Sequence, residues 1–133
     1  MKYPQIITGV GLVVLVLLLC VKGPKQTAPT YSAATETTIQ GVVSEIHDFY
    51  CPISGDEGTH LVLQTANGSI EIHVAPKRFL VGNGLSFRVG DRVEVIGSIV
   101  TYQGHEAMIA RSLARGSQIV AVRQLSGKPL WAE

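Results

Sequence analysis

The sequence predicts an all-β domain, a small closed barrel of five to six strands with one short helical turn, preceded by an N-terminal transmembrane helix. From Thr38 onward, short runs of alternating apolar and polar residues recur between Gly, Asn and Asp residues, a pattern typical of half-buried strands. Residues 3–21 are instead apolar and uncharged. A chain of 133 residues holds one domain and a leader, because single domains commonly contain about 100–150 residues.

The leader has the length of a membrane anchor. Nineteen consecutive residues, 3–21, carry no charge, and an apolar helix needs about 20 residues to cross the hydrocarbon core. We therefore assign residues 1–22 to a signal anchor or transmembrane helix. Residues 23–37 are rich in Pro, Thr, Ser and Ala and lack apolar periodicity, which predicts a flexible tether. Residues 38–133 form the domain.

Two alternatives to a retained anchor stay open. Signal-peptide cleavage needs small residues shortly after the apolar core, and the candidate near Ala28 is followed directly by Pro29. Residues 17–20 resemble the sequence before a lipidated bacterial cysteine, but Leu19 stands where that pattern has Gly or Ala. We expect the leader to be retained and the domain to be exported.

The first three strands are predicted from alternation and turn chemistry. Residues 39–47 mix β-branched and polar side chains, and Gly41 allows a bend or bulge there. Residues 61–65 and 69–74 alternate on either side of Asn67-Gly68. Because Asn and Gly tolerate positive φ, this dipeptide between two alternating runs predicts a β-hairpin.

The second half of the domain is predicted in the same way. Residues 76–81 break the alternation and begin with Pro, which suits the first turn of a helix. Strands follow at residues 92–102 and 106–113, joined by a turn at Gln103-Gly104. One further strand is predicted at residues 118–123.

The order of three strands, a helical turn and two strands resembles the OB-fold, a five-stranded Greek-key barrel. Residues 87–97 strengthen the resemblance, because a Gly-Asp turn such as Gly90-Asp91 opens the fourth strand of many OB domains. A later glycine, here Gly97, lets that strand coil sharply. The resemblance covers residues 38 to about 115 and implies a fold rather than an activity.

The whole chain resembles small exported OB-fold proteins of bacteria, which implies a location at the inner membrane with the domain on the periplasmic side. Its architecture is similar to that of the haem chaperones of cytochrome c maturation. That family attaches haem through a His followed four positions later by Tyr. Here the last histidine, His105, is followed at that spacing by Ile109, so haem attachment is not expected and no cofactor is predicted.

The first loop of the barrel is the candidate metal site. It holds His47, Cys51 and His60 together with three acidic residues, and His and Cys are good ligands for zinc or copper. The spacing matches no established metal signature. A metal or redox role for these three residues is therefore an alternative to the interpretation that they are ordinary residues of a solvated loop.

Basic and aromatic residues suggest a binding surface. We select Tyr50, Lys77, Arg78, Arg88 and Tyr102 as candidate binding residues, because OB barrels bind ligands through aromatic and basic side chains near strands two and three. From Thr38 onward, however, eight Lys and Arg residues face nine Asp and Glu residues. A nucleic-acid binder normally carries a basic excess, so single-stranded nucleic-acid binding is an alternative that the charge disfavours.

No nucleophile, base and orienting group are placed together by the sequence, so we predict no enzymatic activity. Glu71 and His73 are expected on the outer, exposed face of the predicted hairpin. The function predicted from the sequence is that of a membrane-anchored, extracytoplasmic binding module. Its ligand is expected to be a partner protein or small molecule, held by the loops after the first and fourth strands.

Overall fold

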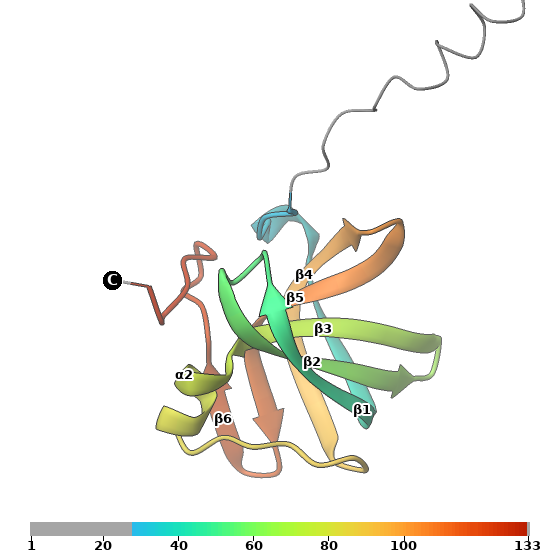
Figure 1. Ribbon diagram of the computed structural model, residues 1–133. Coiled ribbons are helices and arrows are strands. Elements are labelled where there is room, and N and C mark those ends of the chain that lie inside the picture. Colours follow the sequence, from blue (N-terminus) through green and yellow to red (C-terminus); the bar gives the residue numbers. More distant parts are fainter. Residues whose placement is uncertain (1–27, 133) are drawn as a thin grey trace, which may run out of the picture.

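The structure is a computed structural model that describes residues 28–132 (Figure 1). The predicted anchor, residues 1–22, and the first part of the predicted tether lie outside these residues. Within residues 28–132, none of the helices has the length and apolar character required to cross a bilayer.

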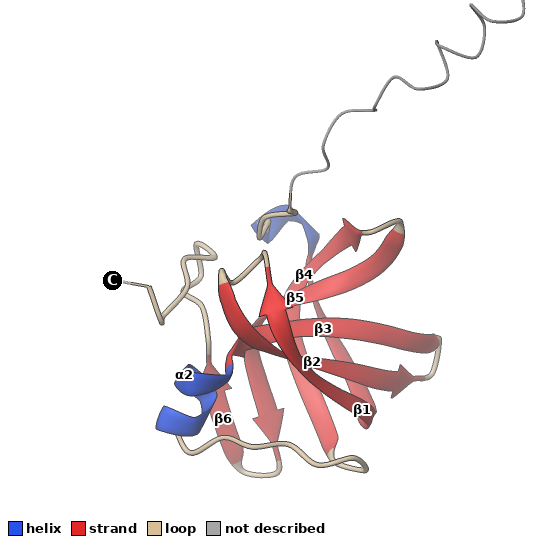
Figure 2. Ribbon diagram, viewed as in Figure 1, coloured by secondary structure: helices blue, strands red, loops and turns tan. Residues whose placement is uncertain are grey.

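Six strands and two short helices make up the described domain (Figure 2). The elements, in chain order, are η1 (Ala33–Thr35), β1 (Glu36–Cys51), β2 (Asp56–Thr65), β3 (Gly68–Pro76), α2 (Lys77–Gly82), β4 (Arg92–Tyr102), β5 (His105–Arg115) and β6 (Gln118–Ala121). The all-β prediction with one short helical turn between the third and fourth strands is therefore confirmed.

The strands close into a barrel. Their order in the sheet is β3-β2-β1-β4-β5-β6, and β3 also pairs with β5 in parallel at residues 71–73 and 107–109. Closure between β3 and β5 leaves a five-stranded Greek-key barrel with α2 at one end, which is the OB-fold. Strand β6 extends the sheet beyond this barrel by pairing with the end of β5.

Strand β1 is longer than the predicted 39–47 because it serves two parts of the sheet. Residues 36–42 pair with β4, and residues 42–51 pair with β2. The strand bends between these halves, where its register with β2 shifts between Val43 and Glu45. Gly41 lies just before the bend, and a Cβ there would lie 2.7 Å from the carbonyl oxygen of Gln64. The predicted bulge thus lies two residues beyond Gly41, and Gly41 itself allows the close approach of β2.

The interior of the barrel is filled by aliphatic side chains from all five strands, including Leu61, Ile72, Val95 and Met108, each fully buried. Phe79 of α2 packs against this core, and Trp131 from the C-terminal segment meets its ring with centroids 5.9 Å apart. The helix and the C-terminal segment thus close one end of the barrel.

Candidate metal centre

Three buried side chains with metal-ligating atoms meet on one side of the barrel. Cys51 is the last residue of β1, His60 lies on β2 and His73 on β3. The face of strands two and three, between the β1–β2 and β4–β5 turns, is the surface on which OB-folds commonly bind ligands. The group, which we call the Cys-His cluster, occupies this face.

The hairpin register brings the two histidines together. The two-residue turn pairs Thr65 with Gly68, and the ladder continues from there until His60 lies opposite His73. Residues directly opposite each other in an antiparallel pair project from the same face of the sheet. Beyond this point the register shifts by a bulge between Thr59 and His60.

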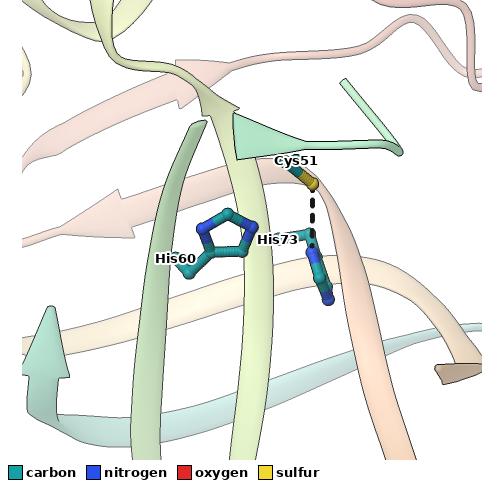
Figure 3. A group of neighbouring side chains, drawn as sticks. All are labelled: Cys51, His60 and His73. Atoms are coloured by element: carbon teal, nitrogen blue, oxygen red, sulfur yellow. Dashed lines mark hydrogen bonds between the residues drawn. The ribbon is translucent and has the colours of Figure 1, made fainter. Parts of the chain in front are cut away.

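The three side chains of the cluster lie close together (Figure 3). The Sγ atom of Cys51 lies 3.4 Å from Nδ1 of His73, and one ligating atom from each of the three residues lies within 4.8 Å of the others. Cys51, His60 and His73 are each no more than 2% exposed. The expectation that His73 lies on an exposed outer face is therefore wrong.

Aromatic rings cover the cluster. The ring of Phe49 stacks on His60, with centroids 3.9 Å apart and planes 2° from parallel. The ring of Tyr102, at the end of β4, meets His73 edge-on at 4.8 Å. This cover explains why a face that the alternation assigns to solvent is buried: side chains from β1 and β4 lie over it.

The histidines leave buried nitrogen atoms without partners. Neither Nδ1 nor Nε2 of His60 has a hydrogen-bond partner among the described residues, and the same holds for Nε2 of His73. Burying a polar group without a partner costs about 1–3 kcal/mol. Such groups are rare in folded proteins, and a bound ion is one way in which their lone pairs are satisfied.

The environment of Cys51 favours its thiolate. Burial alone would raise the pKa of the thiol, but the hydrogen bond with His73, the nearby imidazole of His60 and the backbone of Ser54 and Ile53 together outweigh it. The pKa of Cys51 is lowered to about 5. Cys51 therefore presents a thiolate to the two imidazoles at neutral pH, and the thiolate is the form that binds metals.

Glu71 and Cys51 lie on opposite sides of the His73 ring, each next to one of its nitrogens. Its Oε1 atom is 3.3 Å from Nε2 of His73, although the carboxylate is out of line for a hydrogen bond. Metal-bound histidines usually direct their second nitrogen to a carboxylate, a carbonyl or water, which fixes the ring and raises its basicity. With Nδ1 facing Cys51 and Nε2 facing Glu71, His73 has the arrangement of a metal ligand supported by a carboxylate.

A buried arginine also borders the cluster. Arg123 is 5% exposed and lines the same small hollow as Cys51, His60 and His73. Its Nη1 donates a hydrogen bond to the carbonyl oxygen of Ala110 at 2.7 Å, and its guanidinium lies 4.7 Å from the ring centroid of Trp131. Burial lowers the pKa of Arg123 to about 10, so the group is still charged at neutral pH.

The predicted metal residues are only partly brought together. Cys51 and His60 meet as predicted, whereas His47 does not join them. Its side chain is 53% exposed, and its Nε2 lies 3.7 Å from Glu45. His73 takes the third place. The hairpin register was the signal that could have identified it, since His60 and His73 lie five residues on either side of the turn pair Thr65 and Gly68.

The predicted binding residues are spread over several surfaces. Lys77 and Arg78 at the start of α2 form ion pairs with Asp48 at 3.0 Å and with Asp56 at 2.8 Å. Of the remaining three, Tyr50 and Arg88 are exposed, and Tyr102 covers His73.

The geometry of the cluster suits a transition metal. At bond lengths of about 2.3 Å to sulfur and 2.0–2.1 Å to nitrogen, two ligands of a tetrahedral ion lie about 3.6 Å apart. The 3.4 Å between Cys51 Sγ and His73 Nδ1 is close to that separation. A thiolate and two imidazoles are ligands that suit zinc and copper. These three residues could therefore hold a metal ion after small side-chain rotations.

Comparisons with known proteins identify the family to which the sequence corresponds. The sequence model of the MamS/MamX magnetosome protein family matches residues 35–120, a segment that contains the whole cluster. Among curated proteins, no sequence matches this chain.

Several solved structures are similar. The S. pombe Stn1-ten1 complex shares 15% identity and a TM-score of 0.49 over 62% of this chain and 59% of that chain. A replication protein A heterotrimer bound to ssDNA is 14% identical, with a TM-score of 0.44 over 68% of this chain and 59% of that chain. The N-terminal domain of PriB from Thermoanaerobacter tencongensis is 20% identical, with a TM-score of 0.46 over 64% of this chain and 99% of that chain. This chain thus spans 59% of the length of the first two.

Proposed function

Because this chain belongs to the MamS/MamX magnetosome protein family, we propose that it serves magnetosomes as a non-enzymatic OB-fold module that binds a transition-metal ion. The ligands are Cys51, His60 and His73. This proposal replaces the three-residue set predicted from the sequence, in which His47 stood in the place of His73.

One observation carries the proposal: the buried imidazole of His60, whose two nitrogens have no hydrogen-bond partner among the described residues, converges with the imidazole of His73 and the buried thiol of Cys51. A protein that only needed a stable barrel would gain by filling this space with apolar side chains, because unpartnered buried polar groups reduce stability. A bound metal would use the lone pairs of His60 and His73, and its binding free energy would offset the cost of burying them.

Burial also argues for binding rather than covalent chemistry. A nucleophilic cysteine must be reached by its substrate, and reactive thiolates are partially exposed. Cys51 is 2% exposed and lies beside His60, whose ring is covered by Phe49. A small ion can enter such a site through side-chain motion, whereas an organic substrate would have to displace part of the barrel face.

The proposal includes the anchored, extracytoplasmic location expected from residues 1–22. The uncharged length of residues 3–21 supports a membrane-spanning helix. A module held at a membrane surface would present its metal site next to that membrane. Protease accessibility of the domain in intact and opened vesicles tests this part independently of metal binding.

The full-length chain, purified in detergent and stripped of metal, tests the binding function. Equilibrium dialysis against Zn(II), Co(II) or Cu(I), followed by elemental analysis, should give one ion per chain. Cys51→Ser and His60→Gln should lose that ion, while His105→Gln, which removes an exposed histidine of the β4–β5 hairpin, should keep it. Equal metal content in all four proteins, or none in any, would refute the proposal.

A further inference from the structure

Among the described residues, the metal site has three protein ligands and no fourth in place, since the hydroxyl of Ser54 donates to the carbonyl oxygens of Cys51 and Asp56. The hollow beside the cluster is lined by residues that include Ser54, Thr59 and Arg123 in addition to the cluster itself. Thr59 donates its hydroxyl to Asp48 at 2.8 Å, and arginine has no lone pair to offer. The carboxylate of Glu71 faces the far nitrogen of His73. Among the described residues, the ligand set is therefore one thiolate and two imidazoles.

Little space is left for a water ligand beside the cluster. With the side chains as the structure places them, the hollow has no space for a water molecule, and Phe49 and Tyr102 lie against the two imidazoles. Zinc is almost always four-coordinate, and where the protein gives only three ligands, water completes the shell. A site with one thiolate, two imidazoles and no water ligand therefore suits an ion that is stable with three ligands.

Charge gives a second, independent argument. Arg123 brings one positive charge to the border of the hollow, where it is 5% exposed. A divalent ion on the Cys51 thiolate would leave a further net positive charge beside it, at low dielectric, where uncompensated charge is costly. A monovalent ion on the same thiolate is neutral. Two acids lie near the cluster. Glu71 is 40% exposed and is partly screened by solvent, and the charge of Asp48 is balanced by Lys77 at 3.0 Å.

From these two observations, and resting on the metal-binding function proposed above, we infer that the ion bound by Cys51, His60 and His73 is monovalent copper in a three-coordinate site. Thiolate ligands select Cu(I), and a Cys-His-His set in trigonal arrangement is a known copper-binding geometry. Arg123 is then a selectivity residue that disfavours divalent ions without touching the metal.

Affinity alone cannot test this inference, because copper outranks zinc at most nitrogen and sulfur sites. The decisive measurements are coordination number and the effect of Arg123. The full-length chain is loaded without oxygen with Cu(I) buffered by bathocuproine disulfonate, and X-ray absorption should show one sulfur and two nitrogen neighbours. Arg123→Met should strengthen Zn(II) binding by roughly tenfold or more, since it removes a nearby charge at low dielectric. Cu(I) binding should change much less.

Arg123→Lys is the matched control, because it keeps the charge and should keep the discrimination. Thermal unfolding of each metal-free variant reports whether it folds, and Arg123→Gln replaces Arg123→Met if the latter does not. A four-coordinate copper site, or equal changes in Zn(II) and Cu(I) affinity, would overturn the copper inference and leave the metal-binding function intact. Absence of any metal that depends on Cys51 would overturn both.

Discussion

His60 and His73 lie directly opposite each other on β2 and β3, with ring centroids 4.7 Å apart and planes 86° from parallel. The edge of one ring therefore faces the other ring, and the lone pairs of both are available to a third group. Cys51, at the end of β1, supplies that group. The relationship also determines how the site can be tested, because each histidine can be replaced without altering the ladder that holds the other.

Replacing His60 by Leu should stabilise the metal-free protein and abolish metal binding. Both ring nitrogens of His60 are buried without partners among the described residues, and removal of such groups recovers part of a cost of about 1–3 kcal/mol. Leu is similar in volume and can pack under Phe49. Urea unfolding of metal-free wild type and His60→Leu measures the difference in the free energy of unfolding. A less stable variant would show that the ring has partners that the structure does not reveal.

Glu71→Gln should weaken metal binding by about 10- to 100-fold, the usual effect of removing a carboxylate behind a ligating histidine. The carboxylate lies 3.3 Å from His73 and is 40% exposed, so the stability of the metal-free protein should hardly change. Competition with a chromophoric chelator measures the affinity. Glu106→Gln, an exposed acid on the neighbouring strand β5, is the control and should bind metal as wild type does.

The metal-free protein should become more stable as pH rises from about 5 to 9. The pKa of the Cys51 thiol is about 5 in the folded state, against 9.0 as its ordinary value, so the unfolded chain binds more protons throughout this interval. The stabilisation is complete above pH 9 and is lost as pH falls through 5. Cys51→Ala should lack this part of the pH dependence, and an ultraviolet thiolate titration should give the folded pKa directly. A thiol that titrates at its ordinary value would contradict the described hydrogen bonds.

Gly97→Ala should destabilise the barrel by about 1–3 kcal/mol or more, the range for overpacking. A Cβ at this position would lie 2.3 Å from the carbonyl oxygen of Ile109, where the β4–β5 register shifts between Ile96 and Gly97. Gly82→Ala is the control, because nothing lies within 4 Å of a Cβ there. Denaturant midpoints of the two variants should differ clearly; equal midpoints would show that β5 yields at little cost.

The sequence was sufficient for the fold because its signals are local. The turn after Thr65, the Gly90-Asp91 turn and the alternation in β3 and β4 each act over a few residues. The end of β1, residues 48–51, lies beyond the predicted strand and is mostly exposed. Its strand conformation comes from pairing with β2 rather than from its own pattern.

The candidate site was only half predictable, because part of it depends on contacts that are not local in the sequence. Cys51 and His60 were selected by residue type, but the burial of His73 depends on Tyr102, which arrives from β4. Arg123 could not be placed near the cluster by any local pattern, because it follows β6 and lies beside β5, where its backbone bonds to Arg111 and its side chain to the carbonyl oxygen of Ala110. Contacts between residues distant in sequence decide both positions.

The bend in β1 has a mechanical consequence. Pairing with β4 ends at Val42, so the last part of the strand is held by β2 on one edge only, and Cys51 is its final residue. An ion bound by Cys51, His60 and His73 would link the end of β1 to the β2–β3 hairpin. Metal binding should then change hydrogen exchange in the backbone. The amide hydrogens from Glu45 to Cys51 should exchange slowly with the ion bound and faster in the metal-free protein.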